Sequence, residues 1–325
     1  MMMSATEHEH RFELFGTRVR VLVSSAMPSA LATQLITRRV QHRLQAIHRA
    51  LTRFEQSSEL NHLNAHAGEP VRVSETLLEG VQAALQAARL SGGLVDPTVL
   101  SGLERAGYAT SRVGVAPAPL ADALAGAPPR VPAAAQPAAE WKRIHVDADE
   151  RVVRLPRGVR LDLGGSAKGM AVDLAAQMLA TNPAFAIDAG GDIRLGGTYA
   201  TPRTVEIAHP LLDQPAHNVT LTAGAVATSG LRTRVWRAGD GFAHHLIDPA
   251  RGVPAWTGVI QATALAPTAL EAETLAKMAL LSGPLAGRAA LERYGGALIL
   301  DSGKLILVGE LDTHPGYATV ERLTA

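Results

Sequence analysis

The sequence predicts an α+β protein, and three observations support that fold class. Residues 18–24 place a valine at every second position, as expected of a half-buried strand. Residues 31–51 and 75–90 repeat apolar side chains every three or four positions, which is typical of amphipathic helices. Further strand and helix patterns follow in mixed order, and mixed order favours the α+β class.

The two helices of the first half carry boundary signals. Ser29 stands just before the first periodic leucine and is a candidate N-cap for the helix over residues 31–51. Gly92 and Gly93 follow the helix over residues 75–90. Glycine often ends a helix because it adopts the left-handed conformation without strain, so we expect this helix to stop there.

An Ala- and Pro-rich segment over residues 114–140 separates two halves of the chain. Its composition predicts a surface connection, with one short helix at residues 120–124. A length of 325 residues allows one large domain or two modest ones. We predict a single domain over residues 1–325, with residues 11–113 as its N-terminal half and residues 141–325 as its C-terminal half.

The second half opens with strand patterns and a glycine turn. Residues 152–155 and 159–163 predict two strands, the second with alternating valine and leucine. Gly164 and Gly165 then turn the chain into a helix that starts near Lys168. A strand, a glycine turn and a helix N-terminus in succession can bind an anion, because free N–H groups gather at the start of a helix.

The remaining patterns complete the predicted fold. Residues 184–187 predict a strand that runs into a second glycine turn at Gly190 and Gly191. Residues 298–300 and 305–308 flank a short turn, and this spacing predicts a closing hairpin.

Composition excludes several functional classes. The 31 Lys and Arg nearly balance the 30 Asp and Glu, so nucleic acid finds no broad basic field. The chain has no cysteine, which excludes disulfides, thiolate catalysis and cysteine-ligated metal. Residues 1–10 lack the apolar run of a secretory signal, and no stretch reaches the ~18 apolar residues of a membrane helix. We therefore expect a cytoplasmic protein without a membrane segment, or a periplasmic one if a signal was removed.

The glycine turns indicate a phosphorylated ligand, because their main-chain N–H groups can approach phosphate oxygens closely. Lys168 stands at the first turn of its helix, where a cation is unfavourable unless an anion lies nearby. Asp192 lies beside the second turn, and two roles remain for it: forming that turn or contacting a ligand. Two interpretations also remain for His245: a solvated or structural residue, or a functional one. Neither turn has the spacing of the dinucleotide or nucleoside-triphosphate loops.

In their order along the chain, these segments resemble the ApbE family, the FAD:protein FMN transferases. The matched blocks are Phe-Gly-Thr at 15–17, Ser-Ser-Glu-Leu-Asn-His-Leu-Asn at 57–64, Ser-Gly-Gly-Leu-Val-Asp-Pro-Thr at 91–98, Asp-Leu-Gly-Gly-Ser-Ala-Lys-Gly at 162–169, Ala-Gly-Gly-Asp-Ile-Arg at 189–194, Ala-Thr-Ser-Gly at 227–230 and His-Leu-Ile-Asp-Pro at 245–249. The resemblance covers nearly the whole chain. It implies mixed or antiparallel sheets packed against helices, with an FAD site between the two halves.

The resemblance implies an enzyme that joins the FMN half of FAD, through its phosphate, to a threonine or serine hydroxyl of an acceptor protein and releases AMP. It implies Mg²⁺ as the ion that neutralises the phosphates, with Glu273 and the backbone of Gly165 at the metal positions. Implied catalytic residues are His245, Asp192 and Lys277, and the ordinary histidine pKa of ~6.5 suits a general base. The residues implied in FAD binding are Phe15, Phe54, Asp96, Gly164, Gly165, Lys168, Asp173, Asp192, Thr228 and Ser229.

Glu273 and Lys277 depart from the family's pattern, which has an aspartate and a threonine there. An ammonium cannot ligate a metal, but it can act as a point charge. We therefore expect Mg²⁺ to bind weakly or not at all, with Lys277 carrying charge in its place. The alternative is an ordinary surface pair four residues apart, worth ~0.2–0.5 kcal/mol. Phe15 and Phe54 replace a methionine and a tyrosine and keep the bulk needed to stack on a ring system.

Two other functions stay open at this point. Altered metal ligands could leave an FAD-binding protein without transfer activity, a flavin chaperone or sensor. Water in place of the acceptor hydroxyl would give an Mg²⁺-dependent pyrophosphatase that splits FAD into FMN and AMP.

Overall fold

An antiparallel sheet of eight strands lies at the centre of the computed structural model, which describes residues 6–25, 30–309, 311 and 317–320. The hydrogen-bonded neighbours in this sheet are all antiparallel. In spatial order the strands are β1 (Thr6–Leu14), β2 (Thr17–Ser25), β6 (Ala184–Ala189), β7 (Asp192–Gly196), β10 (Gly224–Gly230), β15 (Val259–Ala266), β16 (Gly296–Leu300) and β17 (Leu305–Val308). The predicted α+β class is confirmed, as are the strands at 18–24 and 184–187 and the closing hairpin of β16 and β17.

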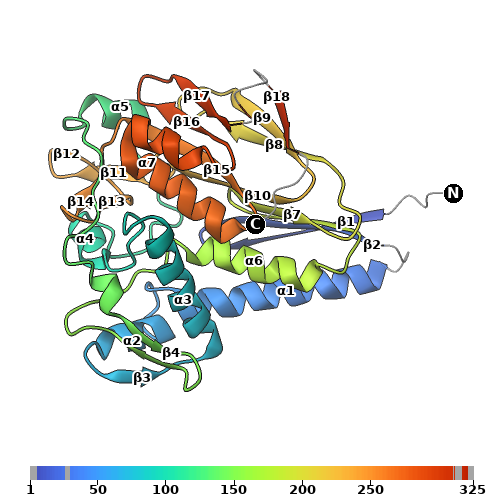
Figure 1. Ribbon diagram of the computed structural model, residues 1–325, viewed down its shortest axis with the longest axis horizontal. Helices are drawn as coiled ribbons and strands as arrows, with labels where there is room; N and C mark the ends of the chain where they lie inside the picture. The colour runs from blue at the N-terminus through green and yellow to red at the C-terminus, as the bar shows by residue number, and fades with distance from the viewer. Residues whose placement is uncertain (1–5, 26–29, 310, 312–316, 321–325) are drawn as a thin grey trace.

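Three long helices lie side by side across one face of this sheet (Figure 1). Helix α1 (Ala30–Leu51) packs on β1 and β2, α6 (Ala167–Leu179) on β6 and β7, and α7 (Ala269–Leu291) on β10 and β15. Helix α3 (Glu75–Leu90) packs against all three. The predicted helices over residues 31–51 and 75–90 and the helix starting near Lys168 are therefore confirmed.

The ends of these helices follow local chemistry. The Ser74 hydroxyl accepts a hydrogen bond from the Leu77 N–H at 3.2 Å and caps α3. Gly92 and Gly93 have φ of 62° and 90° and end that helix, as predicted. The predicted N-cap of α1, Ser29, lies outside the described residues.

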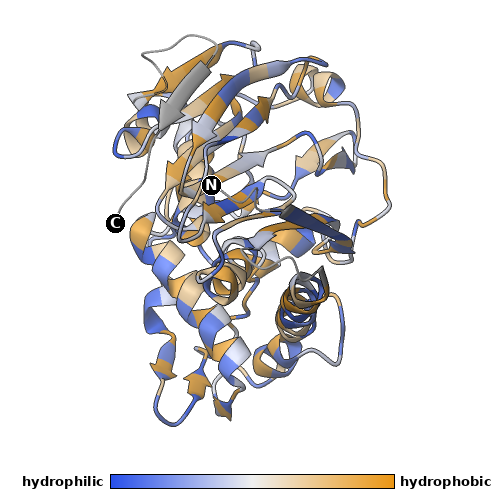
Figure 2. Cartoon of the chain, turned by 90° about the vertical axis from the view of Figure 1, so that its right-hand side faces the viewer, coloured by the Kyte–Doolittle hydropathy of each residue, from blue (hydrophilic) through white to orange (hydrophobic). Residues whose placement is uncertain are grey.

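A smaller sheet covers the opposite face of the large one. It is ordered β18 (Tyr317–Val320), β9 (Pro215–Leu221) and β8 (Arg203–Ala208), with β9 parallel to β18 and antiparallel to β8. Along β6, Phe185 and Ile187 face the main core, whereas Ala186 belongs to a second apolar cluster with Val219 and Leu221 of β9. Hydrophilic and hydrophobic residues alternate along many of the helices and strands (Figure 2).

Short elements complete the fold. Helix α5 (Leu120–Ala125) confirms the helix predicted at residues 120–124, and β5 (Val152–Arg154) confirms the strand predicted at 152–155. The connection over residues 114–140 bonds to the C-terminal half, with the Val131 N–H donating to the Trp256 carbonyl at 2.9 Å. The subdivision at this connection stays a prediction. The short elements are α2 (Glu59–Ala65), α4 (Leu100–Arg105), α5 (Leu120–Ala125), a 3₁₀ helix (Glu140–Arg143), β3 (Pro70–Arg72), β4 (His145–Asp147), β5 (Val152–Arg154), β11 (Val235–Ala238), β12 (Gly241–His244), β13 (Ile247–Asp248) and β14 (Val253–Pro254).

Among the described residues, none of the helices combines the length and the apolar character that crossing a membrane requires.

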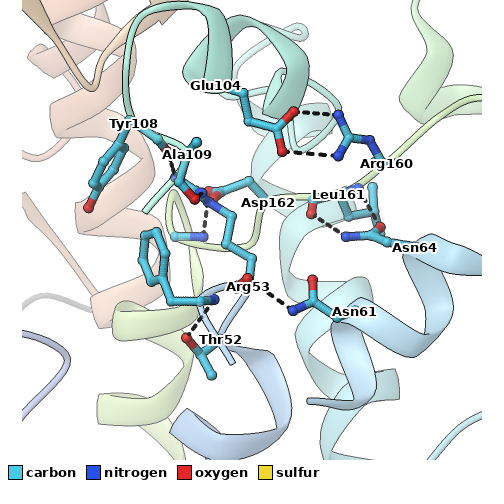
Figure 3. A network of polar contacts seen from close by, with 12 residues as sticks. Thr52, Arg53, Asn61, Asn64, Glu104, Tyr108, Ala109, Arg160, Leu161 and Asp162 are labelled. Carbon is cyan, nitrogen blue, oxygen red and sulfur yellow. Dashed lines mark hydrogen bonds and ion pairs between the residues drawn. The ribbon is translucent and has the colours of Figure 1, made fainter. Parts of the chain in front are cut away.

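The strand predicted over residues 159–163 is wrong. Within the described chain no strand pairs with this segment, and a side chain takes the strand's place. The amide nitrogen of Asn64 donates to the Leu161 carbonyl at 2.9 Å, and its amide oxygen accepts from the Leu161 N–H at 2.7 Å (Figure 3). The alternating valine and leucine therefore reflect burial of one side of the segment and not membership of a sheet.

The second glycine turn is required by the close approach of β2. Gly190 has φ of 67°, and a Cβ atom there would lie 2.2 Å from the Thr17 hydroxyl oxygen. Only glycine fits both the left-handed backbone and the contact. The turn therefore connects β6 to β7 tightly and brings Asp192, the first residue of β7, into the core.

We expect Asn64→Ala to lower the free energy of unfolding by roughly 2–4 kcal/mol, because it leaves the buried N–H and C=O of Leu161 without partners. Equilibrium denaturation in urea measures the loss. Asn182→Ala is the matched control, since that amide makes one partly buried bond at the end of α6 and should cost about 1 kcal/mol. An Asn64 variant as stable as this control would contradict the assigned role.

Candidate active site

A cavity of about 890 Å³ opens between the two halves of the chain. The turn between β1 and β2, the end of α1 and residues 94–99 line it from the N-terminal half. The glycine loop before α6, the segment 245–247 and α7 line it from the C-terminal half. The predicted site residues on this wall are Phe15, Phe54, Asp96, Gly164, Gly165, Lys168, His245 and Lys277.

The N-terminal side of the cavity carries aromatic side chains. Phe15 occupies a two-residue turn with Gly16, and its φ of 55° is left-handed, a conformation that is costly for a bulky side chain. The Phe15 ring packs edge-on against His48 with ring centres 5.4 Å apart. Phe54 and Tyr108 form a second aromatic pair with ring centres 5.5 Å apart. These side chains offer ring surfaces to a flat aromatic ligand.

Arg53 links the aromatic pair to the glycine loop, and sequence reasoning missed it. Its side chain is 4% exposed, and its Nε donates to Asp162 Oδ2 at 2.6 Å (Figure 3). The guanidinium carbon lies 4.2 Å from the Phe54 ring centre and 4.8 Å from the Tyr108 ring centre. Asp162 Oδ1 in turn accepts from the Gly164 N–H at 2.9 Å. The only signal in the sequence was its position next to Phe54, which the resemblance implies in FAD binding.

Asp96 carries an oxygen without a partner in the cavity wall. Its Oδ1 accepts hydrogen bonds from the N–H and the hydroxyl of Thr98 at 2.7 and 2.6 Å. Its Oδ2 is buried and has no hydrogen-bond partner within the described chain. Burial raises the pKa of Asp96, against the hydrogen bonds from Thr98 that lower it. A ligand N–H or O–H group would satisfy this oxygen.

The floor of the cavity holds two buried ion pairs. Lys168, in the first turn of α6, donates to Asp192 Oδ2 at 2.5 Å. Lys277 of α7 donates to Glu273 Oε1 at 2.7 Å, and Glu273 Oε2 accepts from the Gly169 N–H at 2.8 Å. The side chains of Glu273 and Lys277 are only 1% and 13% exposed. The alternative of a surface pair is therefore wrong, since this pair is buried at the cavity.

The two pairs are coupled electrostatically. Burial alone would lower the pKa of Lys168, but the charges of Asp192 and Glu273 outweigh burial and raise it. Burial raises the pKa of Glu273, as does the charge of Asp192, while the ammoniums of Lys277 and Lys168 act in the opposite direction. Each of the two carboxylates at the floor is therefore stabilised by an ion pair with a neighbouring ammonium.

His245 is held neutral at the cavity wall. Burial lowers its pKa well below the ordinary value, and the positive charges of Arg234 and Lys277 add to this effect. Its Nδ1 lies 3.4 Å from the Arg234 carbonyl oxygen. The expectation of an ordinary pKa near neutrality is therefore wrong. Its neighbour His244 is fully buried against Trp256, and burial lowers its pKa to about 3.

Five predicted site residues do not line the cavity: Asp192, Glu273, Thr228, Ser229 and Asp173. Asp192 and Glu273 lie behind Lys168 and Lys277 and hold them through the ion pairs. Thr228 lies on β10, where its hydroxyl shares a hydrogen bond with Thr263 at 2.8 Å and its N–H donates to Gly191 at 3.2 Å. Ser229 follows it and is 8% exposed.

Asp173 also lies elsewhere, in a second hollow of about 480 Å³. Its two oxygens accept from the N–H groups of Ala269 and Leu270 at 2.8 and 2.9 Å, so it caps α7. Arg194 lies 3.4 Å from it and balances its charge. The structure places Asp173 at a helix junction and does not bring it to the predicted ligand.

The residues at the implied magnesium positions do not fit that ion. Both oxygens of Glu273 are engaged, one by an ammonium and one by a backbone N–H. Lys277, at the second ligand position, has no lone pair to offer. Across residues 6–25, 30–309, 311 and 317–320, no group of three or more His, Asp or Glu is arranged to hold a metal. Mg²⁺ needs a near-octahedral set of oxygens, and this donor set does not supply one.

Two curated proteins are similar to this chain in sequence over most of its length. The chain is 29% identical to the FAD:protein FMN transferase of Treponema pallidum over 304 residues, which covers 87% of this chain and 81% of the relative. It is 27% identical to the FAD:protein FMN transferase of Vibrio cholerae, over 82% of this chain and 78% of the relative.

Solved structures share the fold. The ApbE protein of Thermotoga maritima superposes with a TM-score of 0.78 at 26% identity, covering 95% of this chain and 99% of that chain. The flavin transferase ApbE of Vibrio cholerae superposes with a TM-score of 0.71 at 21% identity, with the same coverage. The model of the ApbE family matches residues 15–300, which is most of the sequence, and the chain therefore belongs to the ApbE family.

Proposed function

We propose that this protein is an FAD:protein FMN transferase, which moves FMN from FAD to a threonine or serine hydroxyl of an acceptor protein and releases AMP. The observation that carries the proposal is one cavity with an aromatic wall on one side and a glycine loop with buried lysines on the other. A flavin ring suits the first side and a pyrophosphate the second. The curated relatives named for this activity support the same function.

The phosphate side combines three favourable features. The loop of Gly164 and Gly165 leaves room for a ligand to approach the main chain closely. It leads into the N-terminus of α6, where free N–H groups and the helix dipole favour an anion. Lys168 adds a formal positive charge and is fixed there by Asp192. We assign Lys168 to phosphate binding and Asp192 to its placement.

The reaction follows from charge and proton balance. The acceptor oxygen forms a bond to the flavin-side phosphorus, while the bond from that phosphorus to the bridging oxygen breaks and AMP leaves with that oxygen. The hydroxyl proton passes to His245, whose neutral ring has a lone pair to accept it. Lys277 neutralises negative charge that develops on the phosphates. No step of this reaction uses Mg²⁺, because Glu273 and Lys277 do not supply the free oxygen ligands that this ion needs.

The decisive experiment combines purified protein, FAD and a candidate acceptor protein. Intact-mass spectrometry of the acceptor should show addition of FMN through a phosphoester, with AMP released in equal amount. Free FMN with AMP would identify a pyrophosphatase instead. FAD binding without AMP release would identify a binding protein.

We expect Lys168→Ala to weaken FAD binding roughly tenfold or more, because a charge-assisted contact to phosphate is lost. Riboflavin has no phosphate, so its affinity should change little and also report that the aromatic side is intact. Fluorescence titration measures both ligands. Equal losses for FAD and riboflavin would refute the phosphate assignment.

We expect His245→Ala to reduce turnover roughly 10²-fold or more while leaving FAD affinity nearly unchanged, as expected for a general base. The base must be deprotonated, so activity is lost only as pH falls through the pKa of His245, which lies well below the ordinary value. The wild-type profile of kcat/KM against pH should therefore show no acidic limb near ~6.5. A limb at that pH, or a variant with wild-type turnover, would contradict this role.

We expect Mg²⁺ to have little effect on the wild type and more on Lys277→Thr, because a hydroxyl beside Glu273 restores a hard oxygen ligand. Lys277→Met is the matched control, since it also removes the ammonium but adds no ligand. Calorimetric titration with Mg²⁺ and FAD turnover with and without EDTA compare the three proteins. Strong EDTA inhibition of the wild type, or equal responses of the two variants, would show that Lys277 does not stand in for the ion.

A further inference from the structure

The cationic side chains on the cavity wall differ in whether they have a carboxylate partner. Four Lys and Arg residues lie on this wall: Arg53, Lys168, Arg234 and Lys277. Three of them are paired, to Asp162, Asp192 and Glu273 at 2.6, 2.5 and 2.7 Å. Within the part of the chain that the structure describes, the Arg234 guanidinium has neither an ion pair nor a hydrogen bond. Arg234 is therefore the cation whose charge is available to a ligand.

The backbone of Arg234 is held beside His245. It lies in the turn between β10 and β11, and its N–H donates to the Leu231 carbonyl at 3.2 Å. Its own carbonyl faces His245 Nδ1 at 3.4 Å. Arg234, His245 and Lys168 line the same cavity, and the positive charge of Arg234 acts to lower the pKa of both other residues.

This placement is unfavourable without a bound anion. Arg234 is partly buried and lines the same cavity as the ammoniums of Lys168 and Lys277, and like charges repel one another. The carboxylates of the floor do not relieve that repulsion, because Asp192 and Glu273 already accept from the two lysines. A pyrophosphate diester carries two negative charges, and a planar guanidinium can bind phosphate oxygens through two hydrogen bonds.

We infer that Arg234 binds the pyrophosphate of the ligand and neutralises the phosphate that leaves as AMP. The inference deepens the proposed function and rests on it for the identity of the ligand. Among the four cations of the cavity wall, Arg234 is the one that forms no ion pair with a carboxylate of the described chain. Arg234 thereby supplies positive charge at the pyrophosphate. The residues at the implied magnesium positions do not supply that charge by holding an ion.

The test compares Arg234→Gln and Arg234→Lys with the wild type, and Arg232→Gln is the matched control. The Arg232 side chain donates to the His209 carbonyl at 3.3 Å and does not line the cavity. Calorimetry with inorganic pyrophosphate measures anion binding without a flavin, and fluorescence titration measures FAD and riboflavin. Thermal unfolding checks that each variant is folded.

Arg234→Gln should weaken pyrophosphate and FAD binding about tenfold or more and change riboflavin affinity less than about twofold. Arg234→Lys should recover part of the loss, because it keeps the charge but not the planar fork. Turnover should fall further than FAD affinity, because Arg234 also neutralises the leaving phosphate. The control variant should behave as the wild type.

Unchanged pyrophosphate binding in Arg234→Gln, no pyrophosphate binding in the wild type, or an equal loss for riboflavin would each overturn the inference. Failure of the proposed function is a separate outcome, in which the wild type transfers no FMN to any acceptor. In that case a selective loss of pyrophosphate binding in Arg234→Gln would still identify Arg234 as a phosphate-binding residue.

Discussion

The site depends on the close crossing of helices α6 and α7 at Gly169. A Cβ atom at that position would lie 2.7 Å from the Ala269 carbonyl oxygen and from the Leu270 Cα, so only glycine allows the contact. Because the helices touch, Glu273 reaches the Gly169 N–H. Asp173, one turn further along α6, reaches the first N–H groups of α7. One contact thus sets the distance between the glycine loop and the residues of α7 that line the cavity.

Charge explains why this crossing matters for chemistry. Two carboxylates and two ammoniums are withdrawn from water at the floor, and such groups are tolerated only when they are paired. The ion pairs orient Lys168 and Lys277, and they also engage the carboxylates of Asp192 and Glu273. The oxygen ligands that a divalent ion would need are therefore occupied, and an anionic ligand meets protein cations instead.

The N-terminal half solves a different problem, which is to present aromatic surface at a fixed distance from the charges. Phe15 is held in a left-handed conformation that the pairing of β1 and β2 imposes. Arg53 contacts the faces of Phe54 and Tyr108 and also holds Asp162, which belongs to the glycine loop. Arg53, a residue of the N-terminal half, therefore links the aromatic side of the cavity to the glycine loop of the C-terminal half.

The sequence alone determined the elements whose signals are local. Periodicity predicted α1 and α3, and the glycine turn predicted the start of α6. The order of short motifs predicted the family and placed Lys168 directly after the loop of Gly164 and Gly165. Tertiary structure decided what depends on distant partners. Residues 159–163 form no strand because Asn64, far away in sequence, bonds their backbone.

The same reason separates the roles of the charged residues. Asp173 lies in a matched motif, yet the position of α7 makes it a helix cap. His245 was expected to titrate near neutrality, but burial and the charges of Arg234 and Lys277 hold it neutral. Arg53 and Arg234 carry no motif, and their roles arise from which side chains fold around them. A sequence specifies which groups exist, whereas burial and pairing, which decide their charge and availability, are properties of the folded chain.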